Sequence, residues 1–247
     1  MSAGSPTQSQ LPAADDADPS IAAKVLSHII ERGARVQDPA VKAYVERLRE
    51  HNPEATPAEI IEKLDKHYLA AVIASGAAVG STAAFPGIGT LVAMSAVAGE
   101  TVMFLEATAV YVLAVAEVHG IPADHHERRR ALVLAVLVGD DSKHAVSSLL
   151  GSGRTSGAWL SEGAATLPLP AVSQLNSRLL RYFVKRYTLK RGAIALGKLL
   201  PAGIGAVVGG VGNRLMGKKI REHAHTAFGP PPARWPSPLH LLPAPNA

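Results

Sequence analysis

Hydrophobic positions in the central part of the chain follow one another without charge, and their pattern indicates helices. Residues 68–99 contain no Asp, Glu, Lys or Arg, and most of them are Ala, Gly, Val or Leu. Pro86, Gly87 and Gly89 interrupt this run, because neither Pro nor Gly continues a helix cheaply. We therefore expect two apolar helices, at about 58–84 and 90–118, joined by a tight turn.

No segment alternates β-branched or aromatic residues with polar ones, so the sequence predicts an all-α fold, a helical bundle built around this Gly/Ala-rich hairpin. Residues 1–17 and 229–247 are rich in Pro and polar residues and are expected to be disordered or extended tails. Between them we predict amphipathic helices in 18–66 and a larger helical domain in 67–228.

Several helix ends can be read directly from the sequence. Amphipathic helices are predicted at 19–33, at 39–50 and from 57 onward, each beginning with Pro after an Asp or Thr. Gly120 follows the second apolar helix in the position of a C-terminal cap. Two capping boxes are predicted, one formed by Thr56 and Glu59 and one by Asp124 and Glu127.

A second apolar pair of helices is predicted near the C-terminus. Residues 200–205 contain Pro201 and Gly205 and resemble the first turn, and a helix rich in small residues is expected from Gly205 to Phe228. The two similar turns suggest pseudo-symmetry within the helical domain.

The apolar hairpin could enter a membrane or form the core of a bundle. Its first arm is short and consists mostly of small residues, and its second arm contains Glu100 and Glu106. An ionised carboxylate near the centre of a spanning helix costs about 2.5–3.5 kcal/mol, which disfavours two independent spans. We expect these acids to lie on a wet helix face, the alternative being a buried position that marks a ligand or ion site.

Positive charge is concentrated in the last third of the chain, although the net charge of the whole is only +5. The segment from Arg178 to Arg221 contains eleven basic residues and no acidic ones. The predicted helix 178–191 carries a basic face and aromatic side chains, a combination suited to an anionic lipid surface. A solvated outer face of a bundle helix explains the pattern equally well, and nucleic acid is the least favoured partner. The candidate membrane-surface residues are Arg178, Arg181, Phe183, Lys185, Arg186, Tyr187, Lys190 and Arg191.

The sequence lacks the usual signatures of catalysis and of cofactor or metal binding. There is no Cys, which removes thiolate metal ligands and Cys nucleophiles. Gly212, Gly217 and Lys218 match the spacing of a phosphate-binding loop, but Lys219 stands where that loop needs Ser or Thr. His223 and His225 are two residues apart on a predicted helix and therefore face different ways. We expect no enzyme activity, no cofactor and no metal site.

Small-residue motifs in residues 67–228 resemble the EcsC family. They are the turn containing Pro86, Gly87 and Gly89 before a long Ala-rich helix, and the later stretch from Leu200 through Gly205 to Asn213. The family is linked to secretion and membrane physiology and has no established catalytic activity, so the resemblance implies no catalytic residues.

From these features we predict a non-enzymatic accessory protein of the EcsC type at the cytoplasmic side of the cell membrane, in the absence of a predicted secretory signal. Anionic lipids are the expected partners, together with a membrane protein such as a transporter. The alternative is a soluble helical domain that binds a lipid or small apolar ligand near Glu100 or Glu106.

Overall fold

The computed structural model of the chain describes residues 38–82, 90–121, 125–139, 142, 168–198 and 204–236. Within these ranges it contains six helices and no strands, which confirms the all-α prediction. The helices are α2 (Asp38–Glu50), α3 (Pro57–Thr82), α4 (Thr90–Val118), α5 (His126–Val138), α8 (Leu169–Lys198) and α9 (Ile204–Phe228). The predicted helix 19–33 and the turn residues Pro86, Gly87, Gly89 and Pro201 lie outside the described residues.

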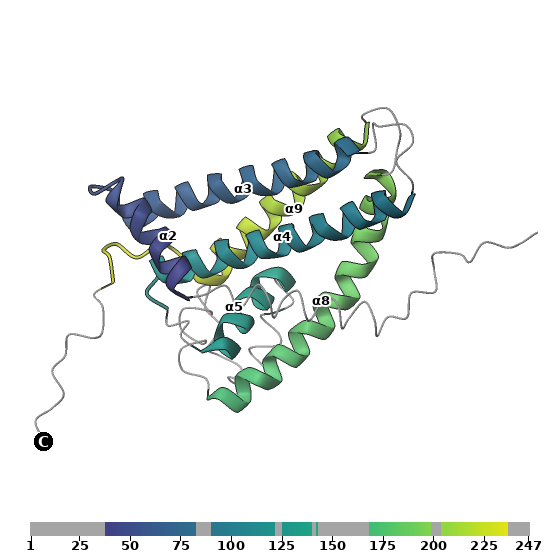
Figure 1. Cartoon of the computed structure of the whole chain (residues 1–247). Coiled ribbons are helices and arrows are strands. Elements are labelled where there is room, and N and C mark those ends of the chain that lie inside the picture. The colour runs from purple at the N-terminus through teal and green to yellow at the C-terminus, as the bar shows by residue number, and fades with distance from the viewer. Residues whose placement is uncertain are drawn as a thin grey trace, which may run out of the picture.

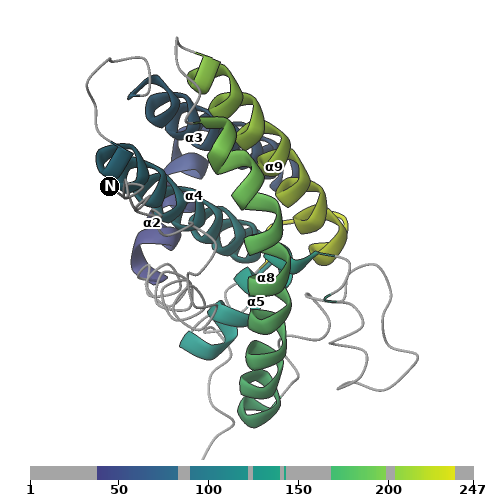
Figure 2. The ribbon, with the colours of Figure 1, turned by 90° about the vertical axis from the view of Figure 1, so that its right-hand side faces the viewer.

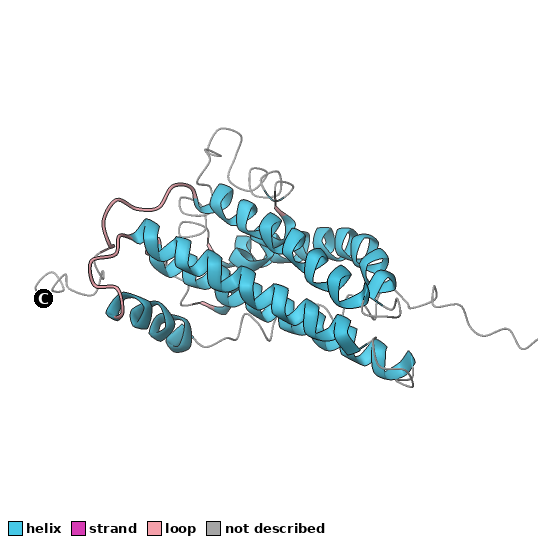
Figure 3. Cartoon of the chain, turned by 90° about the horizontal axis from the view of Figure 1, so that it is seen from above, coloured by secondary structure: helices cyan, strands magenta, loops and turns pink. Residues whose placement is uncertain are grey.

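Two long helices, α3 and α4, run along the upper part of the bundle, and α9 lies beside both (Figure 1). Figure 2 shows α8 and α9 next to each other, and α5, which contacts both of them and α4, lies partly behind α8. Figure 3 shows the described helices from above, where the long ones lie side by side. The predicted arms at 58–84 and 90–118 therefore correspond to α3 and α4 almost residue for residue.

Small residues allow α9 to lie close against α3. A Cβ atom added to Gly217 would come within 2.9 Å of Val72 Cγ2 and 3.1 Å of Leu69 Cδ2, and one added to Gly210 would be 3.6 Å from Ala77 Cβ. Gly217 is thus a packing residue inside a helix, in agreement with our rejection of a phosphate-binding loop. Close helix approach of this kind depends on residues without large side chains.

The core is filled mainly by α4 and α5. Every residue of α5 from Ala131 to Val138 is buried, and α4 buries Phe104, Leu105 and most positions from Thr108 onward. A helix that is apolar on all sides belongs in the centre of a bundle. Among the described residues one segment, Gly99–Val118 in α4, is long and apolar enough to cross a membrane. Because 61% of this segment's apolar stretch is buried inside the protein, the segment is weak evidence for a membrane span.

The predicted helix ends at Thr56 and at Gly120 are confirmed. The Thr56 amide and hydroxyl donate to Glu59 Oε2 (2.7 and 2.9 Å). At the end of α4, Gly120 has φ +68°, and the Gly120 and Ile121 amides donate to the carbonyls of Glu117 and Ala116, the bond pattern of a Schellman cap.

Asp124, one half of the second predicted capping box, lies outside the described residues. The N-cap of α5 is His125, which makes no capping hydrogen bond with its side chain. The Glu127 carboxylate instead accepts a hydrogen bond of 2.7 Å from the Asn176 side-chain amide of α8. This contact joins the start of α5 to α8.

The prediction of an unpacked C-terminal tail from residue 229 is also wrong for its first part. Residues 229–236, which we name the C-terminal strap, lie against the rest of the protein. The Trp235 indole donates to the Ala55 carbonyl at 3.2 Å and stacks under the Arg49 guanidinium at 4.1 Å. A large aromatic ring with a polar N–H finds both contacts here, and this offsets the poor packing of the surrounding prolines.

Candidate functional site

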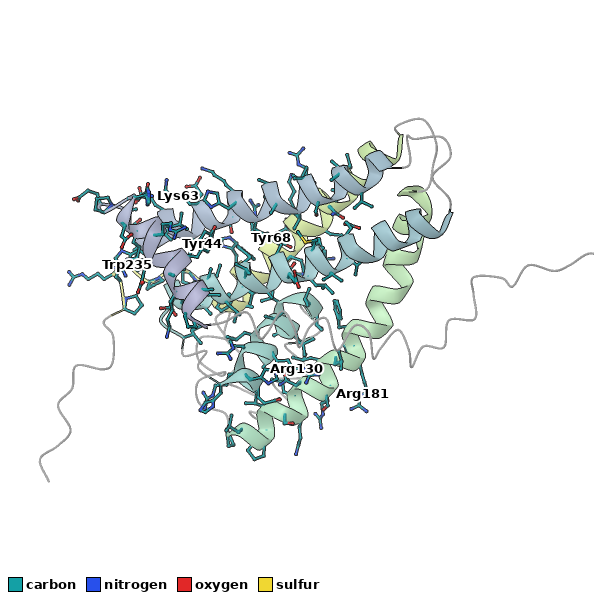
Figure 4. All side chains as sticks on the ribbon, in the orientation of Figure 1. Tyr44, Lys63, Tyr68, Arg130, Arg181 and Trp235 are labelled. Atoms are coloured by element: carbon teal, nitrogen blue, oxygen red, sulfur yellow. The ribbon has the colours of Figure 1, made fainter. Side chains whose placement is uncertain are left out.

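Seven polar side chains line up between α3, α4 and α9, and we call this set the polar seam. On α3 and α4 its members stand three or eight residues apart and so lie on one side of each helix, and on α9 Asn213 and His225 are twelve residues apart. Tyr68 lies between α3 and α4 in Figure 4 and marks the middle of the seam. The seam consists of Asp65, Tyr68, Glu100, Thr108, Tyr111, Asn213 and His225.

Glu100 and Asn213 form the deepest contact of the seam. Their exposed fractions are 2% and 0%. The Asn213 amide donates to Glu100 Oε1 at 2.5 Å and to the Val72 carbonyl at 2.9 Å. Our prediction of a wet face is therefore wrong for Glu100, whereas Glu106 is partly exposed. A carboxylate this deep must be hydrogen-bonded, and the amide fulfils that requirement.

Tyrosines and a threonine occupy the middle of the seam. The Tyr68 and Tyr111 rings stack with centroids 4.5 Å apart and an angle of 13° between their planes. The Tyr68 hydroxyl is 2.9 Å from Thr108 Oγ1, which itself donates to the Phe104 carbonyl at 2.8 Å. These contacts tie α3 to α4 by polar groups inside an otherwise apolar interface.

Asp65 accepts hydrogen bonds from two helices at the other end of the seam. The Tyr111 hydroxyl donates to Asp65 Oδ1 at 2.7 Å, and His225 Nε2 donates to Oδ2 at 2.8 Å. Arg221 Nε lies 4.0 Å from the same oxygen. Burial, followed by the charge of Asp65, raises the pKa of Tyr111 far above its ordinary value, so this phenol stays protonated in the folded protein.

An Asp–His pair is also part of many hydrolytic sites, so the surroundings of His225 are informative. In the described part of the chain no hydroxyl side chain hydrogen-bonds to its imidazole, and its neighbour His223 instead donates to the Val136 carbonyl at 3.1 Å. Nucleophilic catalysis needs a nucleophile within hydrogen-bonding reach of the base. The His225–Asp65 hydrogen bond connects α9 with α3.

The basic helix predicted at 178–191 belongs to α8, and its apolar side faces inward. Phe183 is 4% exposed and Leu179 is fully buried, so both pack in the core. Phe183 cannot act as a membrane anchor from this position, and we remove it from the candidate surface. Arg178 and Arg181 are exposed, and Arg181 points away from α8 in Figure 4. The side chains of Lys185, Arg186, Tyr187, Lys190 and Arg191 lie outside the described part.

A second basic surface, on α9, was missed by the sequence reading. At 100° per residue its members occupy an arc of about 140°, opposite the buried positions Asn213, Gly217 and Ile220. Val211 and Leu215 form its centre and are 51% and 64% exposed. We name this surface the α9 face; it consists of Val211, Arg214, Leu215, Lys218 and Lys219, all exposed.

The periodicity that identifies the α9 face is visible in the sequence. Apolar residues stand four positions apart at Val211 and Leu215, and basic residues flank them on both sides. Gly212, Gly217 and Lys218, which match the spacing of a phosphate-binding loop, lie within α9, as the predicted helix from Gly205 to Phe228 requires. Gly205, predicted as a turn residue, is the second residue of α9. Glu222 is exposed one turn beyond Lys218 and bounds the face at its C-terminal end.

Comparison with known proteins gives no match: no family model, no curated protein and no solved structure matches the chain. The resemblance to the EcsC family thus stays a prediction from the sequence motifs.

Proposed function

We propose that the protein is a non-enzymatic, peripheral membrane accessory protein of the EcsC type, which binds anionic lipid through the α9 face. The observation that carries the proposal is the exposure of Val211 and Leu215 between Arg214, Lys218 and Lys219. Large apolar side chains are rarely exposed beside one another on a helix without a partner, and basic residues on both sides suit a surface of lipid phosphates.

Simple energetics support weak and reversible binding. Each Lys or Arg near an anionic membrane contributes about 1 kcal/mol, so the three basic residues contribute about 3 kcal/mol. Transfer of a Val or Leu side chain out of water contributes up to about 1.5–3 kcal/mol, and a partly exposed side chain contributes less. Arg178 and Arg181 on the adjacent α8 add further positive charge.

Attachment at the surface agrees better with the packing than insertion of the α3–α4 hairpin does. Insertion of α4 would separate Glu100 from Asn213 and Tyr111 from Asp65, leaving buried polar groups without partners. Binding through the α9 face needs no such rearrangement, because its residues are already exposed.

Co-sedimentation with vesicles tests the proposal. We expect the protein to bind vesicles of phosphatidylcholine with one third phosphatidylserine and to dissociate from them as the salt concentration is raised. It should not bind vesicles of pure phosphatidylcholine. The Lys218→Glu/Lys219→Glu variant should lose most of this binding. The matched control is Lys63→Glu/Lys66→Glu, which reverses two charges on α3 and should bind like the parent.

A Leu215→Ser variant separates the apolar contribution from the charge. We expect it to bind more weakly at every salt concentration while its salt dependence stays unchanged. Equal binding by the two double variants, or no binding to the anionic vesicles, would refute the proposal.

A further inference from the structure

The C-terminal strap contacts three separate parts of the bundle. It leaves α9 at Gly229, which has φ +79° and whose amide donates to the His225 carbonyl at 3.0 Å. Trp235 then contacts Ala55 and Arg49 near the start of α3. Pro236 lies directly on Gly120, where an added Cβ would come within 2.7 Å of the proline ring. The strap therefore closes over the C-terminal end of α4.

An imidazole lies beneath the strap at the end of α4. The His119 ring stacks on Phe228 with centroids 5.3 Å apart, and its Nδ1 donates to the Val115 carbonyl at 2.9 Å. Its other nitrogen, Nε2, is inaccessible to solvent and has no hydrogen-bond partner. The cavity beside it is lined by His119, His225, Tyr111, Phe228, Gly229 and Pro231, among others, and its volume of about 10 Å³ has room for at most one water.

We propose that the strap is a proton-sensitive latch: protonation of His119 at Nε2 releases residues 229–236 from the bundle and uncovers the surface at the junction of α2 and α3. The surface in question is a groove of about 320 Å³, lined by Glu46, Arg49, Glu50, Asn52, Pro53, Ala55 and Trp235. This inference does not depend on membrane binding.

The charges around His119 set the direction of the effect. On the α9 side the His119 imidazole faces His225, and Asp65 of α3 and Arg221 of α9 lie behind His225. On the α4 side the imidazole faces the protonated phenol of Tyr111. Ile61 is the α3 residue in the cavity wall, and Arg234, the one charged side chain in the strap, is exposed. No carboxylate among the described residues lines this cavity, so a positive charge on His119 would be buried there without a counter-ion.

Burial lowers the pKa of His119 below its ordinary value of 6.5, and the proximity of His225 lowers it further. The carbonyls of Val115, Gly229 and Pro230 offset only part of this lowering. The closed strap therefore favours neutral imidazole. Its contribution to stability is complete above about pH 6.5 and is lost as the pH falls from there through the lowered pKa.

Tryptophan fluorescence reports the position of the strap. The chain has two tryptophans, so Trp159→Phe leaves Trp235 as the only one. Between pH 7.5 and 5.0 we expect a severalfold rise in quenching of Trp235 by acrylamide, with no loss of helix by circular dichroism. His119→Gln in the same background should abolish the rise, and the control His126→Gln, at the start of α5, should leave it unchanged.

A second measurement does not require His119→Gln to pack well. Because linkage is reciprocal, loosening the strap by Trp235→Ala must raise the pKa of His119 towards 6.5, which a titration of its imidazole by NMR detects. An identical pKa of His119 with and without Trp235 would overturn the proposal. The proposal would also be overturned if His119→Gln left the acid-induced rise in Trp235 quenching unchanged. The same holds if that rise were lost in His225→Gln but kept in His119→Gln.

Discussion

The contact between Glu100 and Asn213 makes a quantitative prediction for Asn213→Ala. The substitution removes the hydrogen bond to the Val72 carbonyl, about 1 kcal/mol, and the charge-assisted one to Glu100, about 1.5–3 kcal/mol. Alanine returns about 0.5 kcal/mol through its higher helix propensity. We therefore expect the free energy of unfolding to fall by about 2–3.5 kcal/mol.

Urea denaturation followed by circular dichroism at pH 7 measures this loss. With a slope of about 2–3 kcal/mol/M, the midpoint should fall by about 1 M. In a Glu100→Gln background the group left behind is neutral, so the same Asn213→Ala change should cost only about 1 kcal/mol. Gln174→Ala, an exposed change on α8, serves as the control and should stay within about 0.5 kcal/mol of the parent.

A loss below 0.5 kcal/mol for Asn213→Ala, or equal losses with Glu100 and with Gln at position 100, would refute this reasoning. The first result would mean that the buried amide has no energetic role. The second would mean that the carboxylate charge does not matter to it.

Two further predictions concern the ends of helices. Gly120→Ala should lower the free energy of unfolding by about 1–3 kcal/mol in the same urea assay, since the residue has φ +68° and contacts Pro236. Gly99, which lies inside α4 and has no atom within 4 Å of an added Cβ, is the control and should gain stability as Ala. Thr56→Ala should cost about 1 kcal/mol through loss of the α3 cap, and thermal unfolding of Thr56→Ser, which retains the hydroxyl, should lie close to the parent.

Local signals in the sequence were enough to predict the hairpin. The Pro and Gly residues between 85 and 90 predict a break in the apolar run, and α4 begins at Thr90 as expected. The cap formed by Thr56 and Glu59 involves residues three positions apart. Interactions of this range depend on a few neighbouring residues and survive in most tertiary settings.

The polar seam could not be predicted in the same way. Asn213 is 113 residues from Glu100, and no sequence pattern near Glu100 indicates this partner. The general rule that charged residues are exposed therefore gave the wrong prediction for Glu100. The prediction that Phe183 lies on the membrane surface was wrong for a related reason. The apolar face of an amphipathic helix can pack on lipid or on other helices, and the sequence pattern is the same in both cases. The strap was missed because a single tryptophan in a Pro-rich tail carries no periodic signal.

Helix α9 joins these features. Its inner side carries Asn213 and Gly217, which contact α3 and α4, and its outer side carries Val211, Leu215 and the basic residues. A rotation of α9 by 100°, one residue, would bury Lys218 against Val72 and expose Asn213, leaving Glu100 without its amide. The polar seam therefore fixes the rotation of the helix, since a purely apolar interface of small residues would tolerate several rotations at similar energy. Through that constraint the buried contacts determine which side chains α9 presents at the surface.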